Sequence, residues 1–162
     1  MTNISNGAMP KVLSINLKTF GQAVVAGLVG LIVWEIFARL FAPFWIGGPL
    51  DPTQLIEMVF GVSGFAGELI HIATALVAFP LAYVFVVLPL ATMMIPGAPW
   101  PILGIAYGAA LWVFAMYVIA SLIGGMPPFL GFQQIAWASL VGHLGLGLGI
   151  AGATSAFNAR SK

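Results

Sequence analysis

The sequence contains no cysteine and very few charged residues. The absence of cysteine excludes disulfides, thiolate-bound metals and covalent haem attachment. Only 6% of the 162 residues are charged, whereas a soluble domain carries roughly 25%. The net charge of +1 comes without a basic cluster, which argues against nucleic acid as a partner, because phosphate neutralisation supplies most of that affinity.

Apolar residues, in contrast, are abundant and come in long runs. They make up 61% of the chain, and the mean hydropathy is +1.10. A surface this apolar would aggregate in water. Several runs approach or exceed the ~20 apolar residues that a membrane-crossing helix needs. The sequence therefore predicts an integral membrane protein that has no separate soluble domain.

Four hydrophobic segments predict the fold class, which is an all-α, polytopic four-helix transmembrane bundle. Pro43 is expected to end the first segment, and Pro80 to kink the second, because it leaves the Leu76 carbonyl without its usual donor. The predicted transmembrane domain covers residues 19–157, with spans at 19–41, 65–92, 102–123 and 135–157.

A short helix is predicted between the first and second spans. The connection is too polar, and too interrupted by glycine and proline, to cross a membrane. Within it, "DPTQLIEMVF" offers Asp51 as N-cap, Pro52 at the first helical position and Gln54 at the third. We expect this helix to lie flat at the membrane surface.

The basic residues predict the orientation of the chain. Four of the five lie outside the spans, near the two ends: Lys11, Lys18, Arg160 and Lys162. An excess of Lys and Arg marks the cytoplasmic side of a membrane protein. The N-terminal segment 1–18 and the tail 158–162 are therefore predicted to be cytoplasmic.

Small residues are spaced for close helix packing. Lipid provides no hydrophobic drive for helix association, so close backbone approach matters. In the fourth span, small residues separated alternately by four and three positions form one stripe: Ala138, Gly142, Gly145, Gly149, Gly152 and Ala156. The third span offers Gly104 and Gly108, and the first offers Ala23, Gly27 and Gly30. These glycines are predicted to lie at helix–helix contacts.

The few ionisable groups of the spans are expected to gather in the half of the membrane away from the termini. Glu68 and His71 share one helix face, and Arg39 lies one turn from Glu35. The predicted polar cluster consists of Glu35, Arg39, Glu68, His71, Ser139 and His143. No comparable group of polar residues is predicted in the cytoplasmic half. Ionisable groups at membrane depth tend to face the bundle interior and to mark sites.

Several functions are compatible with this cluster. Glu35–Arg39 and Glu68–His71 can be satisfied structural pairs. His71 and His143 can be the axial ligands of a b-type haem. Glu68-x-x-His71 can belong to a carboxylate-bridged metal site, although such sites need a second element of this kind. Glu35, Glu68 and His71 can also relay protons or guide a small solute.

Catalytic motifs are absent from the sequence. It contains no nucleophile elbow, P-loop or dinucleotide fingerprint, and we predict no catalytic residue, no metal site and no cofactor other than the haem alternative. The small-residue stripes and the apolar loop "GGMPPFLGF" favour contacts with other proteins. We therefore expect a non-catalytic accessory or scaffolding subunit, surrounded by lipid, that packs against a larger membrane complex.

Four stretches also carry a family resemblance: "AVVAGLVG", "ELIHIATALVAFPLAYV", "YGAALWVFAMYV" and "GHLGLGLGIAG". In helix count, histidine placement and glycine content, the chain resembles the YagU-like small four-helix inner-membrane proteins of bacteria. The resemblance covers about residues 20–157. It implies the four-helix fold and a bacterial inner-membrane location, and no established activity.

Overall fold

The chain is mainly helical in the part that the structure describes. The computed structural model describes residues 16–160 and contains no strand within them. Four helices are long and apolar enough to cross a membrane: Leu17–Ile46, Phe65–Met94, Trp100–Ile123 and Gln134–Arg160. The predicted fold class is confirmed, and each long helix includes the span expected for it. Lys11 and Lys162, on which part of the predicted orientation rests, lie outside the described residues.

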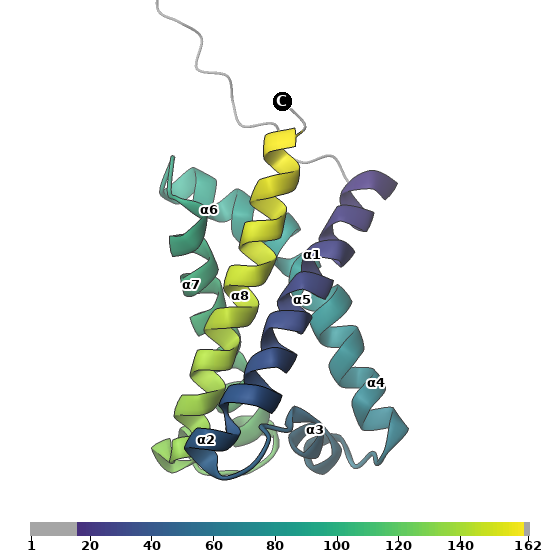
Figure 1. The fold of residues 1–162 in the computed structure, drawn as a ribbon, viewed down its shortest axis with the longest axis vertical. Coiled ribbons are helices and arrows are strands. Elements are labelled where there is room, and N and C mark those ends of the chain that lie inside the picture. The colour runs from purple at the N-terminus through teal and green to yellow at the C-terminus, as the bar shows by residue number, and fades with distance from the viewer. Residues whose placement is uncertain (1–15, 161–162) are drawn as a thin grey trace, which may run out of the picture.

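The four long helices place both ends of the described chain at one end of the bundle (Figure 1). The first helix begins and the last helix ends there, beside the connection between the second and third. The connection between the first and second helices lies at the opposite end with the loop that precedes the last helix. We call these the terminal end and the loop end.

The first long helix continues past the proline that was expected to end it. It consists of α1 (Leu17–Ile36), the π-helical segment η1 (Phe37–Phe41) and α2 (Pro43–Ile46). The Ala42 N–H donates to the Phe37 carbonyl at 2.9 Å, and Pro43 takes the first position of α2. The prediction for Pro43 was wrong because proline is tolerated in a first helical turn, where its missing N–H is not needed.

The predicted short helix is present as α3 (Pro52–Phe60). The Asp51 side chain accepts a hydrogen bond from the Thr53 N–H at 2.9 Å, which confirms Asp51 as the N-cap. The helix ends at Gly61, whose φ of +64° is a left-handed conformation that glycine adopts without strain.

The second long helix is irregular around Pro80. It consists of α4 (Phe65–Ala73), η2 (Thr74–Ala78), α5 (Phe79–Ala82), η3 (Tyr83–Val87) and α6 (Leu88–Met94). The predicted irregularity takes the form of the two π-helical segments η2 and η3. The Leu76 carbonyl, which Pro80 deprives of a donor, lies directly against Gly27 of α1. A Cβ atom at Gly27 would overlap this carbonyl oxygen and would lie 2.7 Å from the Pro80 ring.

The last two long helices form the closest contacts of the bundle. The third consists of α7 (Trp100–Val113) and η4 (Phe114–Ile123), and the fourth is α8 (Gln134–Arg160). Gly108 of α7 lies against the His143 carbonyl, and Gly147 of α8 lies against the Gly104 carbonyl. Such contacts let two helix backbones approach closely.

The predicted glycine stripe of α8 serves two neighbouring helices. Gly142 and Gly145 face the side chains of Trp34 and Val33 on α1, and a Cβ atom at Gly149 would lie 2.8 Å from the Gly30 Cα. Gly152 instead faces the Trp100 ring of α7. A helix of 3.6 residues per turn rotates relative to a 3.5-residue repeat, so one sequence stripe can pass from one neighbour to the next.

The apolar loop before α8 forms a compact 3₁₀ segment, η5 (Pro128–Phe132). Three of its non-glycine residues have positive φ: Phe129 at 50°, Leu130 at 52° and Phe132 at 55°. Aromatic contacts support this costly backbone, since the Phe129 ring lies 4.7 Å from the Trp112 ring and 5.6 Å from the Tyr117 ring, between centroids.

Candidate functional site

Most of the predicted polar residues meet at the loop end of the bundle. We call Glu35, Arg39, Asp51, Glu68 and His71 the acidic cluster. The carboxylates of Glu35, Glu68 and Asp51 all interact electrostatically with the His71 imidazole, as does the Arg39 guanidinium. Side chains from the first helix, from the N-cap of α3 and from α4 therefore act on one histidine.

Glu35 and Arg39 form the ion pair that their spacing predicts. Arg39 Nε donates to Glu35 Oε2 at 2.5 Å. The Arg39 side chain is 67% exposed and the Glu35 side chain 31% exposed. A pair this open contributes at most about 1 kcal/mol to stability where water reaches it.

Glu68 does not form the expected pair with His71. Its Oε2 atom accepts a hydrogen bond from Thr53 Oγ1 at 2.9 Å. A second bond joins the same two elements, because the Gly64 N–H donates to Glu57 Oε1 at 2.6 Å. Both carboxylates therefore fasten α3 to the start of α4. Within residues 16–160, no side chain or backbone group forms a hydrogen bond with the half-buried His71 imidazole.

His143 and Ser139 lie deeper in the bundle, on α8. Nδ1 of His143 is 2.8 Å from the Ser139 carbonyl oxygen, so Nδ1 carries the proton and donates it to this oxygen. The Trp34 ring meets the His143 ring edge-on, with 4.7 Å between centroids. Trp34 Nε1 is buried and has no hydrogen-bond partner among the described residues.

The two histidines offer limited room for a macrocycle. They are close enough to interact electrostatically, but Nδ1 of His143 is already bonded and only Nε2 remains as a ligand atom. The Trp34 ring occupies space beside the imidazole. A haem bound here would have to displace that ring. For a metal ion, no group of three or more His, Cys, Asp or Glu side chains converges within residues 16–160.

A second polar region lies at the terminal end, where the sequence predicted none. Two adjacent cavities, which share Thr154 and Asn158, are lined there by uncharged polar side chains from three helices: Thr19, Gln22, Thr92, Thr154, Ser155 and Asn158. We call this region the terminal crevice. Its smaller cavity, of about 10 Å³, has room for about one water molecule.

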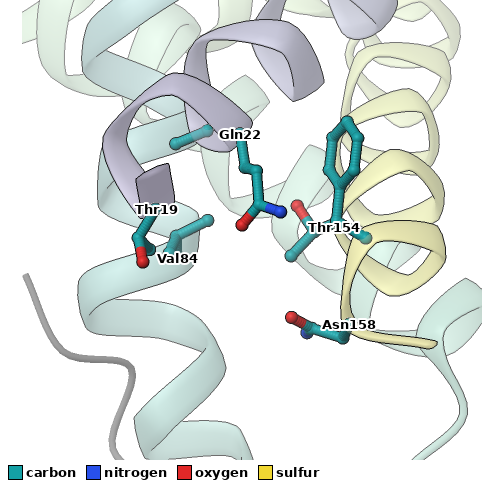
Figure 2. A pocket seen from close by; sticks show the side chains of 7 residues that line it. Thr19, Gln22, Val84, Thr154 and Asn158 are labelled. Atoms are coloured by element: carbon teal, nitrogen blue, oxygen red, sulfur yellow. The ribbon is translucent and has the colours of Figure 1, made fainter. Parts of the chain in front are cut away.

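The smaller cavity lies between the start of α1 and the end of α8. Figure 2 shows Gln22 of α1 facing Thr154 and Asn158 of α8, with Val84 on the opposite side of the cavity, beside Thr19. The sequence did not predict this region because uncharged polar residues are common on transmembrane helices. Thr154 and Asn158 lie four positions apart, and this spacing could have identified a polar face on the last turns of α8.

Comparison with known proteins adds no identification. No protein-family model, curated protein or solved structure matches the chain. The resemblance to YagU-like proteins therefore stays a prediction.

Proposed function

We propose that this chain is a non-catalytic subunit of a larger membrane complex, and that its second long helix is the face that meets a partner. The observation that carries the proposal is the weak covering of this helix within the chain. Only 22% of the most hydrophobic stretch of this helix is buried inside the chain, against 50% of the corresponding stretch in α8. Its first part, α4, has α3 and its own continuation η2 as main neighbours.

Ionisable groups on α4 make it energetically unfavourable to leave this helix exposed to lipid. Glu68 and His71 both lie on this helix, and both are only partly covered. Ionisable side chains at membrane depth are stabilised by other polar groups or by a protein interior. A partner protein that also reaches the His71 side of α4 would supply the hydrogen bond that the imidazole lacks among the described residues.

The interior supports this proposal better than it supports a transport pathway. A continuous polar path would have to connect the acidic cluster with the terminal crevice. The core between them is closed by large buried side chains: Trp34, Tyr83, Tyr107, Leu111, Leu146 and Ile150. The ionisable groups in this part of the core are the hydroxyls of Tyr83 and Tyr107 and the imidazole of His143, which packs against Trp34.

Photo-crosslinking in native membranes tests the proposal. A photoreactive amino acid at Leu69, which is 52% exposed on α4, should give an adduct with a protein of one defined mass. The same amino acid at Ile105 on α7, which is 47% exposed, is the matched control and should react with lipid. Substitution H71F, made in addition, should weaken the adduct at position 69. Lipid adducts alone at both positions would overturn the proposal.

The cellular location belongs to the same proposal. We place the chain in a bacterial inner membrane with the terminal end in the cytoplasm, which is the orientation supported by Lys18 and Arg160 within the described residues. The absence of cysteine allows a clean test with single-cysteine variants. A membrane-impermeant maleimide added to intact spheroplasts should label Ser63→Cys and leave Ala159→Cys unlabelled. The reverse pattern would invert the topology.

A further inference from the structure

The larger cavity of the terminal crevice has the properties of a ligand site. Its volume is about 250 Å³, which is room for roughly eight water molecules at about 30 Å³ each. It lies between the end of the second long helix, the turn that follows, the start of α7 and the last turns of α8. Its walls include the polar side chains of Tyr83, Thr92, Thr154, Ser155 and Asn158.

The Tyr83 hydroxyl is the polar group of this cavity that most needs a hydrogen-bond partner. Its side chain is 1% exposed, and no described residue forms a hydrogen bond with its hydroxyl. Trp34 Nε1 is the one unpartnered side-chain nitrogen or oxygen of residues 16–160 that is sealed from water. The Tyr83 hydroxyl is therefore not sealed from water, and the cavity that Tyr83 lines provides the space that it reaches. A buried hydroxyl without a partner is unfavourable, and a ligand oxygen would remove this cost.

Other hydrogen-bonding groups surround the same space. Ser155 and Asn158 have no side-chain hydrogen-bond partner among the described residues. Thr92 and Thr154 donate their hydroxyl protons to the carbonyls of Pro89 and Ile150, both at 2.8 Å. Their oxygens remain available as acceptors. The cavity thus offers both donors and acceptors.

The remaining walls determine which ligand fits. No charged side chain of the described residues lines the cavity, so a charged head would be buried without a counter-ion. Leu88, Ile95 and Leu103 supply apolar surface, and the Trp100 ring lies over Gly152. Met93 and Met94, which are both highly exposed, lie in the chain between the lining residues Thr92 and Ile95.

We propose that this cavity binds the head of an uncharged lipid, whose hydroxyl or carbonyl oxygens bond to Tyr83, Ser155 and Asn158. The tail of the lipid leaves past Met93 and Met94 into the bilayer. Neutral glycerolipids and isoprenoid quinones both present such a head. This inference does not depend on the proposed partner contact at α4, because it concerns the opposite end of the bundle.

The test measures thermal stabilisation of the full chain in phosphatidylcholine nanodiscs. Dioctanoylglycerol and decylubiquinone are added in separate series, with dioctanoylphosphatidate as the charged control. A neutral lipid that binds the folded state should raise the unfolding midpoint with concentration. Response to dioctanoylglycerol alone identifies a glycerolipid site, response to decylubiquinone alone identifies a quinone site, and response to both identifies a general neutral-head site.

Two cavity variants and one control variant separate specific binding from partition of the lipid into the nanodisc. Tyr83→Phe removes one hydroxyl and should raise the apparent Kd roughly five- to ten-fold, the equivalent of one hydrogen bond. Ser155→Phe fills the cavity and should abolish the response. Tyr117→Phe removes an exposed hydroxyl at the loop end and should leave it unchanged.

Three results would overturn the inference: no response to either neutral lipid, an equal response to the phosphatidate, or an unchanged Kd in Tyr83→Phe. Because Tyr83→Phe is nearly isosteric, the test remains decisive even where Ser155→Phe fails to fold.

Discussion

The Trp34 ring stands edge-on to the His143 ring, with 4.7 Å between the centroids and 76° between the planes. This contact depends on Gly142, because a Cβ atom at that position would lie 2.6 Å from the Trp34 ring. An edge-to-face arrangement is favourable for aromatic rings. The geometry fixes the first and last long helices against each other at the level of the buried histidine, but no group of residues 16–160 accepts a hydrogen bond from the indole N–H.

The unpartnered indole predicts unequal effects of two tryptophan substitutions. Trp34→Phe keeps an aromatic ring against His143 and removes a buried N–H that has no acceptor in the described part of the chain. Trp112→Phe loses a similar volume and also the bond from Trp112 Nε1 to the Ala136 carbonyl at 2.9 Å. We expect Trp112→Phe to lower the free energy of unfolding by about 1–2 kcal/mol more than Trp34→Phe. Chemical unfolding in one detergent measures both, and equal losses would contradict the explanation.

The contact between α7 and α8 should be sensitive to a single methyl group. A Cβ atom at Gly108 would overlap the His143 carbonyl and would lie 2.7 Å from the Leu144 Cα. Because backbone atoms cannot move aside easily, Gly108→Ala should destabilise the fold by about 1–3 kcal/mol. Gly21→Ala is the matched control, since nothing lies within 4 Å of its Cβ position. It should be neutral or stabilising by up to about 1 kcal/mol. The unfolding midpoint distinguishes the two.

The bond between Thr53 and Glu68 should appear as a coupling energy. Thr53→Val and Glu68→Met each remove one partner of the 2.9 Å bond that joins α3 to α4. A double-mutant cycle should give a coupling of about 1–2 kcal/mol, because one partner is charged. The cycle of Thr53→Val with Glu35→Met should give a coupling near zero. Similar couplings in both cycles would mean that the bond does not hold α3 in place.

The left-handed residues of η5 predict opposite consequences for two neighbouring glycine substitutions. Phe129 and Leu130 have almost the same backbone angles, with φ of 50° and 52°, so glycine relieves a similar strain of about 1–2 kcal/mol at each. Phe129→Gly also removes the ring that contacts Trp112, Tyr117 and Phe132. It should therefore be at least about 2 kcal/mol less stable than Leu130→Gly in thermal unfolding. Equal stability would show that the aromatic contacts do not support the loop.

Much of the fold could be predicted because a membrane restricts the alternatives. Backbone groups in lipid must bond internally, so long apolar runs become helices. A local feature could also be predicted where one interaction determines it. The Asp51 N-cap, which depends on a single hydrogen bond to the Thr53 N–H, is an example. The prediction for Pro43 was wrong because proline is compatible with the first turn of a helix. The π-helical segment η1 ends just before Pro43, so Pro43 lies in the first turn of α2. Nothing local to Pro43 identifies the segment.

Neighbours on one helix could be predicted for the candidate site, but contacts between elements could not. The spacing of Glu35 and Arg39 predicts their ion pair, whereas the hydrogen bond from Thr53 to Glu68 depends on how α3 folds back. That return is set by the loop geometry at Gly61 and Gly64. The terminal crevice was missed because threonine, serine and asparagine are common on transmembrane helices. Only their convergence from three helices distinguishes a cavity from ordinary packing.

Pro80 lacks the amide hydrogen that would bond the Leu76 oxygen, and Gly27 lacks the side chain that would collide with this oxygen and with the proline ring. The two residues therefore depend on each other. In related chains, we expect these positions to covary, although they belong to different helices. A lineage that replaces Pro80 would remove the ring and would give the Leu76 oxygen a donor in its own helix. That bond would turn the oxygen toward the helix axis and away from position 27, so both obstacles to alanine there would be reduced. A lineage that keeps the proline would be confined to glycine there.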